Sequence, residues 1–367
     1  MHKWDLDEAL GQLVEMWLIE ASEELDEAKR RYSVHPLTRA FASAKLSSEP
    51  EVSEKAHLRT GYYFLDFARY YGGENLHRYD ALTIELENIL AILDWCYRAG
   101  KWRIVVDFVD AMSLFLDRRG YWVEHIECGK MAIEAGKRLD DKEAIARHKI
   151  FALGWTHIWL WNYEEADRLL TEGQQLAKEI GYQYGLALAL YDLGTLARRR
   201  EDYEKARDLF QESLNIWQLI GDQRWIARAK GNLGSTARYQ GDYDRASQEL
   251  KDALEIARKI NDEEGISNGL RRLGHMANVY GDLEKARQLY KEALRLKEKL
   301  GEERGMGLNK HSLALVEEKA GNFVLAISFA QDALEIFERL GMKKEIEETQ
   351  ELVERLEARI AEARSSG

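Results

Sequence analysis

The sequence has little cysteine and little proline, with two of each in 367 residues. Cys96 and Cys128 are too few for a disulfide framework, and no CxxC pair is present, which favours a reducing, cytoplasmic compartment. No apolar run approaches the ~18 residues needed to span a bilayer, and no charged-then-apolar signal segment opens the chain. We therefore expect a cytoplasmic protein without a membrane span. The scarcity of proline, with 45% hydrophobic and 32% charged residues, is typical of a nearly all-helical protein.

Motifs of catalysis are also missing. The sequence contains no HExxH, no nucleophile elbow and no G-x-x-x-x-G-K-[ST], and its nine His residues show no metal-ligand spacing. We therefore expect no enzymatic activity, no cofactor and no metal. The net charge of -12 disfavours nucleic acid or an acidic membrane as a partner of the whole chain, although it leaves room for a local basic patch.

What the sequence does contain is a repeat with a step of 40 residues. A Leu-Gly pair, an alanine and an aromatic residue or leucine each recur at this interval. The pairs are Leu153-Gly154, Leu193-Gly194, Leu233-Gly234 and Leu273-Gly274, the alanines are Ala166, Ala206, Ala246, Ala286 and Ala326, and the third set is Tyr163, Tyr203, Tyr243, Leu283 and Phe323. A fixed period in this range indicates stacked supersecondary units, which together make an extended binding surface.

Each unit has the pattern of two helices. In residues 182–221, apolar or small residues recur at helical spacing in two runs, separated by a break at 200–202. An Asp or Asn precedes each second helix, where it can accept a bond from an orphan amide: Asn162, Asp202, Asp242, Asp282 and Asn322. A residue that tolerates the left-handed conformation stands where each second helix must end: Gly181, Gly221, Asn261, Gly301 and Gly341.

Three glycines lie inside first helices, at positions 194, 234 and 274, where glycine costs about 1 kcal/mol relative to alanine. This cost predicts close approach of the neighbouring helix. We expect the small residues Ala206, Ala246 and Ala286 on the other side of that contact.

The order of these residues resembles the tetratricopeptide repeat: Leu-Gly, then Ala twelve residues after the Gly, an aromatic residue or Leu four later, and Ala three after that. Leu273-Gly274, Ala286, Tyr290 and Ala293 are one example. Two departures are the missing proline after the second helix and the length of 40 rather than 34 residues, both consistent with longer helices. The resemblance implies an all-α fold, a right-handed superhelix (α-solenoid) of 40-residue helical hairpins. We expect a divergent helical pair at 101–140, five repeats over 141–341, and a capping helix and tail at 342–367.

Residues 1–48 do not follow the period. Residues 9–14 have the pattern of a helix, residues 17–20 and 31–34 of two short strands, and Pro36 sits in the first turn of a further helix. This order resembles the end of the winged-helix domain of STAND-type signalling NTPases, and residues 49–100 resemble the helical arm that leads to the repeats in those proteins. The resemblance implies that His35 senses a nucleotide phosphate, in a longer parent protein only, because this chain has no P-loop. The structural alternative is a strand-end His bonded to nearby backbone.

In tetratricopeptide arrays, ligands usually lie along the inner face formed by the first helices. Counting from each Leu-Gly pair places there the residues three before the Gly and one, four and five after it. The resulting ligand-binding candidates are Phe151, Trp155, Trp159, Tyr191, Thr195, Arg198, Arg199, Ser235, Arg238, Tyr239, Arg271, His275 and Asn278. This face is aromatic at one end and arginine-rich in the middle, which favours ligands with carboxylates or phosphates. The alternative is that the aromatic residues pack against the divergent pair and that the arginines pair with Glu of neighbouring helices.

These features predict a non-catalytic sensor and scaffold: the regulatory tetratricopeptide region of a STAND signalling NTPase, monomeric as this fragment. Its expected partner is a protein or peptide ligand of acidic character, with a small molecule as the other ligand class. Two alternatives stay open, a free-standing adaptor for protein–protein interaction and a regulator that senses a small molecule such as a sugar. Neither a membrane nor a nucleic acid is expected as a partner.

Overall fold

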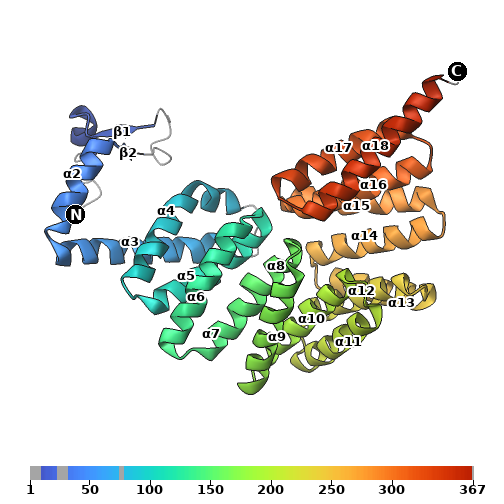
Figure 1. The fold of residues 1–367 in the computed structure, drawn as a ribbon, viewed down its shortest axis with the longest axis horizontal. Helices are drawn as coiled ribbons and strands as arrows, with labels where there is room; N and C mark the ends of the chain where they lie inside the picture. Colours follow the sequence, from blue (N-terminus) through green and yellow to red (C-terminus); the bar gives the residue numbers. More distant parts are fainter. Residues whose placement is uncertain (1–9, 23–31, 74–77, 366–367) are drawn as a thin grey trace. The chain divides into compact units, whose positions relative to one another are not determined.

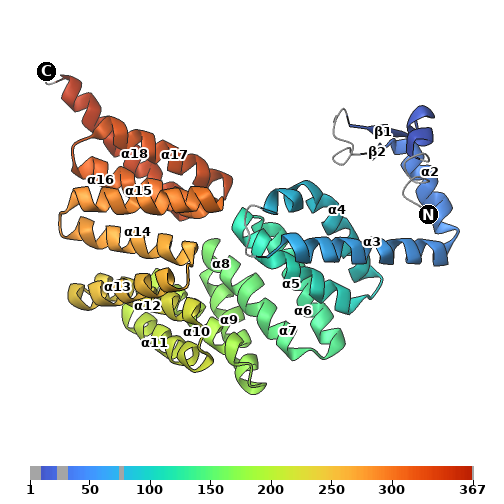
Figure 2. The same ribbon diagram turned by 180° about the vertical axis from the view of Figure 1, so that it is seen from behind.

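The computed structural model describes residues 10–22, 32–73 and 78–365, with side chains as far as residue 361 (Figures 1 and 2). The chain divides into two compact units, Met1–Tyr63 and Phe64–Gly367, and each is described by itself. Within the described ranges, every helix is too short or too polar to cross a bilayer.

The N-terminal unit contains a short helix over residues 10–15, then β1 (Ile19–Ala21), β2 (Tyr32–Val34) and α2 (Pro36–Ser47). The strands pair antiparallel, with Ile19 opposite Val34. The prediction of two short strands is therefore confirmed, but β1 starts two residues later than expected because Trp17 is left-handed, with φ of 57°. Residues 9 and 31 of the predicted elements lie outside the described residues. A winged-helix origin of this unit stays a prediction.

The second unit is a stack of antiparallel helices that follow one another in chain order from cyan to red in Figure 1. After α3 (Pro50–Tyr71), which begins in the first unit, come α4 (Tyr79–Arg98), α5 (Trp102–Arg119) and α6 (Trp122–Leu139). In the first repeat, the first helix consists of α7 (Lys142–Arg147), the π-helix η3 (His148–Gly154) and α8 (Trp155–Trp159) in direct succession. The first helices of the other repeats are α10 (Gln183–Arg199), α12 (Gln223–Tyr239), α14 (Glu263–Val279) and α16 (Glu303–Lys319). The second helices are α9 (Tyr163–Glu179), α11 (Tyr203–Ile220), α13 (Tyr243–Lys259), α15 (Leu283–Leu300) and α17 (Phe323–Arg339), and α18 (Lys343–Ser365) follows.

The ends of these helices keep the 40-residue step, for local reasons. Successive second helices begin 40 residues apart, at Tyr163, Tyr203, Tyr243, Leu283 and Phe323. The predicted stop residues all have positive φ, between 54° at Asn261 and 83° at Gly221, as a left-handed helix end requires. The breaks between the two helices of each pair also need a left-handed residue, which the sequence prediction missed. These residues are Trp161, Glu201, Gly241, Gly281 and Gly321.

The predicted N-caps divide by residue type. Asp202, Asp242 and Asp282 each accept a hydrogen bond from the backbone N–H three residues on, at 3.1 Å. Asn162 and Asn322 occupy the same position but make no such bond. Instead, the Asn322 side-chain amide donates to Glu317, which fixes the preceding helix end. The prediction of a side-chain cap at every second helix is therefore wrong for the two asparagines.

The helix glycines are close-contact positions, as predicted, but their partner differs from the one expected. A Cβ atom at Gly194, Gly234 or Gly274 would lie 2.9, 2.8 or 2.7 Å from a side chain of the paired helix, respectively Phe210, Leu250 and Tyr290. The contact is thus made by the large residue four positions after each alanine. The alanines are fully buried in the same helix pairs.

The ends of the repeat array contact each other inside the second unit. Trp122 of α6 packs in a cluster with Phe337, Leu340 and Met342 from the last repeat. The space above Gly120 is filled by Leu340, whose Cδ2 would lie 2.5 Å from an added Cβ atom. Helix α16 packs against α5 as well. The superhelix therefore closes upon itself around an interior space.

Candidate functional site

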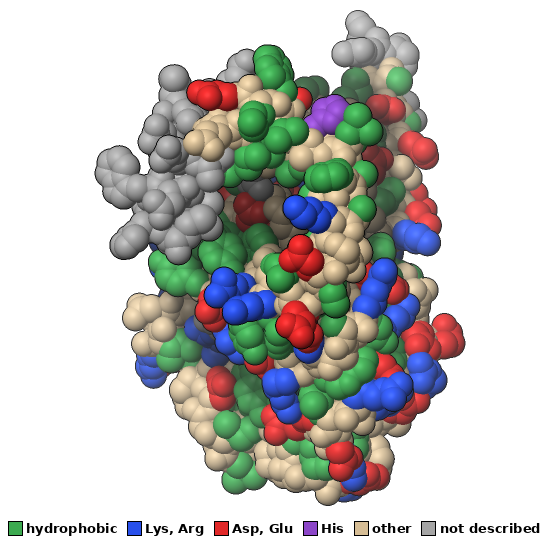
Figure 3. Space-filling model, turned by 90° about the vertical axis from the view of Figure 1, so that its left-hand side faces the viewer, with side chains coloured by type: hydrophobic (Ala, Val, Ile, Leu, Met, Phe, Trp, Pro, Cys, Tyr) green, Lys and Arg blue, Asp and Glu red, His purple; other side chains and the backbone are tan. Residues whose placement is uncertain are grey.

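A cavity of about 950 Å³ lies inside the closed superhelix. Most of its wall is built from the first helices of the repeats, α10, α12, α14 and α16, together with α5 and the η3–α8 segment, and residues of α4, α7, α13 and α15 complete it. A volume near 1,000 Å³ is at the upper end of the range, about 300–1,000 Å³, that small-molecule sites occupy. On the face shown in Figure 3, acidic and basic side chains are interspersed.

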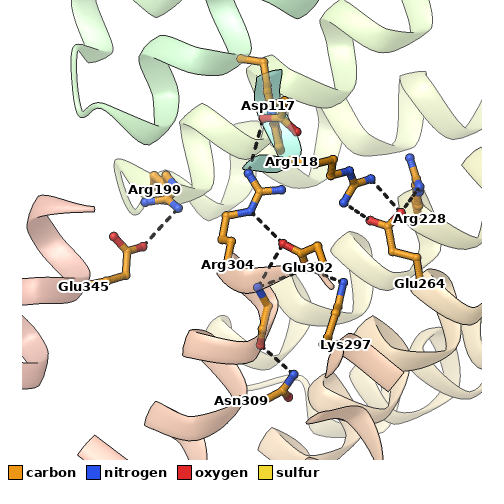
Figure 4. Close-up of polar contacts among 12 residues, drawn as sticks. Asp117, Arg118, Arg199, Arg228, Glu264, Lys297, Glu302, Arg304, Asn309 and Glu345 are labelled. Carbon is orange, nitrogen blue, oxygen red and sulfur yellow. Dashed lines mark hydrogen bonds and ion pairs between the residues drawn. The ribbon is translucent and has the colours of Figure 1, made fainter. Parts of the chain in front are cut away.

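One side of the cavity carries a network of ion pairs between helices that are distant in sequence (Figure 4). Arg118 of α5 donates two hydrogen bonds to Glu264 of α14, at 2.8 and 2.7 Å. Arg228 adds a third bond to the same carboxylate, at 3.1 Å. Next to this group, Lys297 and Glu302 form a buried pair at 2.7 Å, in which each side chain is 3% exposed. The carboxylates on this side are therefore compensated by cations of other helices.

The charges in this network shift one another's proton affinities. Burial alone would raise the pKa of Glu264, but Arg118, Arg228 and Lys297 outweigh it and hold that pKa well below its usual value. Burial likewise opposes ionisation of Glu302, and the cations Lys297 and Arg304 lower the pKa of Glu302 to about 2. Both groups are ionised at neutral pH, so the Arg118–Glu264 pair links α5 to α14 by opposite charges.

A second part of the wall is aromatic. Trp155 donates its indole N–H to Asp117 of α5 at 2.9 Å, and Trp159 lies under both Arg199 and Arg304, at 4.2 and 4.4 Å from the ring centre. Phe151 meets His125 of α6 edge to face. Each of these aromatic residues lines the cavity and contacts another part of the protein at the same time. Packing against the divergent pair, the alternative named above, is therefore found for Phe151 and Trp155, whereas Trp159 contacts α10 and α16 and packs against the cluster that contains Trp122.

A third part of the wall holds arginines without a carboxylate partner. Arg198 of α10 and Arg271 and Arg272 of α14 all line the cavity, and within the described ranges none of the three forms an ion pair. The Nε atom of Arg198 is buried and makes no hydrogen bond to any described residue. Arg272 donates to the Asn232 side-chain oxygen at 2.7 Å. Burial, together with repulsion from the other two guanidiniums, lowers the pKa of Arg272 to about 10.

Arg271 is held by a chain of neutral groups. Its Nη1 lies 3.1 Å from His275 Nε2, and the Tyr290 hydroxyl lies 2.8 Å from His275 Nδ1. A guanidinium can only donate, so Nε2 must accept and the ring proton resides on Nδ1. Burial, followed by the nearby Arg271 and Arg238, keeps the pKa of His275 well below its usual value, so the ring stays neutral.

The structure brings eight of the predicted residues to the cavity and leaves five away from it. The eight are Phe151, Trp155, Trp159, Tyr191, Thr195, Arg198, Arg199 and Arg271. The other five are engaged elsewhere: Ser235 bonds to the Gly231 carbonyl, Arg238 lies over the Tyr239 ring, Tyr239 stacks on Tyr203, His275 supports Arg271, and Asn278 accepts from Lys319. The alternative of Arg–Glu pairing holds for Arg199, which meets Glu345 at 3.4 Å. A role in ligand binding stays a prediction for all of them.

The sequence prediction did not include several residues that line the cavity, because it used only four positions around each Leu-Gly pair. Arg272 and Asp192 lie two residues before the Gly of the Leu-Gly pair, a position that also faces inward. Trp225, Arg228 and Glu264 lie six to ten residues before that Gly, in the halves of α12 and α14 closer to the helix start. Extending the same 3.6-residue spacing towards the helix starts would have found them.

His35 in the first unit has a structural role. It is the N-cap of α2, and its Nδ1 accepts from the Leu37 backbone N–H at 3.3 Å. This contact corresponds to the structural alternative given for this residue. Its nucleotide-sensing role in a longer protein stays a prediction.

The comparisons with known proteins agree with this architecture. A family model described as tetratricopeptide repeat matches residues 153–218, 185–259 and 265–339. The apo form of RapI is similar in fold, with a TM-score of 0.57 at 14% identity over 76% of this chain and 98% of that one. A Rap protein complexed with competence and sporulation factor gives a TM-score of 0.54 at 14% identity, over 74% of this chain and 80% of that one. At this level of identity the likeness shows the fold alone.

One curated protein is similar in sequence: the transcription activator GutR of Bacillus subtilis (strain 168), 25% identical over 146 residues. The match covers 36% of this chain and 17% of that protein, so this chain spans a small part of its length. The family match, the 40-residue period and the antiparallel helix pairs lead to one conclusion. The chain contains tetratricopeptide repeats, which form an all-helical repeat solenoid.

Proposed function

We propose that the solenoid is a non-catalytic sensor region that binds a ligand in its central cavity and passes the binding event on to a larger signalling protein. The observation that carries this proposal is the cavity of about 950 Å³, which is lined by side chains from helices between α4 and α16 of the solenoid. A ligand bound there contacts α5, α10, α14 and α16 together, so binding is coupled to the arrangement of the whole ring.

A STAND-type parent protein is the finer form of this proposal. It is supported by the two strands and α2 that precede the repeats, and by the similarity to GutR, which is described as a transcription activator. A P-loop encoded within roughly the next 300 residues upstream, the size of one or two further domains, is the feature that tests it. An upstream sequence without such a motif would contradict the STAND assignment and leave ligand sensing in place.

Ligand binding in the cavity is tested by thermal-shift screening of metabolites and short peptides, since a ligand that binds the folded state raises the melting temperature. Leu308 lines the cavity, and Leu308→Trp is expected to reduce the shift by occupying part of that volume. Leu219 of α11 is 87% exposed, so Leu219→Trp is the matched control. A ligand whose effect is the same in both variants binds elsewhere and contradicts the cavity as the site.

A second candidate function is a scaffold for a protein or peptide partner. It is supported by the fold shared with the Rap protein that was crystallised with competence and sporulation factor. Under this function, the peptide arm of the screen gives the response and the metabolite arm does not.

A further inference from the structure

We propose that Arg198, Arg271 and Arg272 form a binding site for an oxyanion, the phosphoryl or carboxylate group of a small anionic ligand. This inference rests on the proposed function, because it names the chemical class of the ligand that the cavity binds.

Charge is distributed unevenly within the cavity. Arg118, Arg228 and Lys297 have Glu264 or Glu302 as partners. The three arginines of the proposed site have no such partner in the described part of the chain. Their positive charges repel one another: burial lowers the pKa of Arg272, and the charges of Arg271 and Arg198 lower it further. Neighbouring buried cations are unfavourable unless an anion compensates them. An oxyanion placed among them removes this repulsion.

The supporting contacts orient two of the guanidiniums and neutralise none of them. Arg271 donates to neutral His275, and Arg272 donates to the Asn232 amide oxygen, so both contacts fix position without adding negative charge. Arg272 also bonds to the side chain of Tyr191, another neutral group. A guanidinium has five N–H donors, and its planar fork matches the paired oxygens of a carboxylate or phosphate. Arg198 contributes from α10, on a different repeat, with an Nε that makes no hydrogen bond to the described residues.

The backbone also makes room for this arrangement. A Cβ atom at Gly231 of α12 would lie 1.9 Å from Nη1 of Arg272. The absence of a side chain at position 231 therefore allows the Arg272 guanidinium to lie against α12, between the repeats that carry Arg198 and Arg271. Any larger residue at position 231 displaces the guanidinium.

The nearby acidic groups do not compete for these arginines. Asp192 also lines the cavity, but burial and then Asp117 raise its pKa well above the usual value, which disfavours its charged form, and it makes no ion pair with any described residue. Glu302 is bound to Lys297. The three arginines are therefore not neutralised by these carboxyl groups and can bind an external anion.

The test compares anion binding in the full chain and in four variants. Inorganic phosphate, sulfate and malonate are titrated against potassium chloride of equal ionic strength, with melting temperature and calorimetry as readouts. We expect saturable binding of phosphate or malonate to the wild type and to the control Arg295→Gln, which alters an exposed arginine on α15. Arg271→Gln and Arg272→Gln are expected to bind roughly tenfold or more weakly, because each removes a charge-assisted hydrogen-bond donor.

Two further readouts separate this site from a purely structural role. In chloride, Arg272→Gln is expected to melt no lower than the wild type, because it removes an uncompensated buried cation. Gly231→Ala keeps every charge but is expected to weaken anion binding by displacing the guanidinium. A response to phosphate but not malonate assigns a phosphoryl ligand, and the reverse assigns a dicarboxylate.

The inference is overturned if no anion stabilises the wild type beyond chloride, or if Arg272→Gln responds as the wild type does. In either case, a neutral metabolite whose binding is reduced in Leu308→Trp would show that the cavity is still a ligand site. Failure of the anion site is therefore distinguishable from failure of the proposed function.

Discussion

The alanines, glycines and large apolar residues that recur every 40 positions pack against one another between the two helices of each repeat. The alanine at each 40-residue step has no exposed surface, and it packs where the two helices of a pair meet. The large residue four positions later covers the helix glycine of the partner, as Leu250 covers Gly234. Small and large residues thus alternate along the same contact, and a change in size at either position alters the fit.

Ala246→Leu tests this packing. Three additional carbon atoms in a fully buried position are expected to lower the free energy of unfolding by roughly 1–3 kcal/mol through overpacking. Urea denaturation measures the effect. Lys251→Leu, on the exposed face of the same helix, is the control and should change stability by less than about 0.5 kcal/mol. Equal stability of Ala246→Leu and the wild type would contradict the packing.

The free energy of unfolding is expected to depend on pH through Glu302. Its folded pKa of about 2 lies below the unfolded value, so the unfolded chain binds more protons between these values. The stabilisation is therefore fully present above about pH 5 and lost progressively as the pH falls towards 2, amounting to on the order of 3 kcal/mol. Glu302→Gln is expected to be less stable at pH 7 and to lose less on acidification.

The measurement is the urea midpoint at several pH values between 7 and 2.5. Glu255, an exposed residue that pairs with Lys259 of its own helix, provides the control variant Glu255→Gln. If Glu302→Gln follows the same acid profile as the wild type, the pair with Lys297 does not contribute the expected pH-dependent stability.

At the scale of helices, the sequence is most informative because the signals are local. Helix starts, stops and the 40-residue step depend on residues within one or two turns of each other, and all are recognisable without a partner helix. The missing cap bonds of the two asparagines could not be predicted from the sequence. Asn322, for example, can bond either to its own helix or to Glu317 of the preceding helix, and in the structure it bonds to Glu317. The π-helix η3 is similarly invisible in the residue pattern, since His148–Gly154 keeps the apolar spacing of an ordinary helix.

The difference between Asp and Asn caps is testable. Asp242→Ala removes a hydrogen bond to the Arg245 N–H and is expected to cost about 1 kcal/mol of stability. Asn162→Ala removes no cap bond and is expected to cost a few tenths of a kcal/mol. Urea midpoints of the two variants provide the comparison, and an equal loss in both would show that the side-chain bond is not what stabilises the helix start.

At the scale of the whole solenoid, the contact between its two ends is the feature that the sequence did not predict. Arg118 and Glu264 are 146 residues apart, and no periodic pattern relates α5 to α14. The period predicts contacts between neighbouring repeats, whereas closure depends on the curvature summed over all of them. For the same reason, the sequence placed Arg198 and Arg271 on an inner face but could not show that this face encloses a cavity.

Closure predicts a specific effect of Trp122. This side chain is 4% exposed and packs against Phe337 and Leu340 of the last repeat, so Trp122→Ala is expected to cost about 3–5 kcal/mol. Because the lost contacts join the two ends of the array, the variant should also have a larger radius of gyration in small-angle scattering. Trp102→Ala is the control, since Trp102 packs on Tyr97 near the start of α5. A Trp122→Ala protein that is destabilised without expanding would mean that the ion pairs Arg118–Glu264 and Arg199–Glu345 hold the ring closed by themselves.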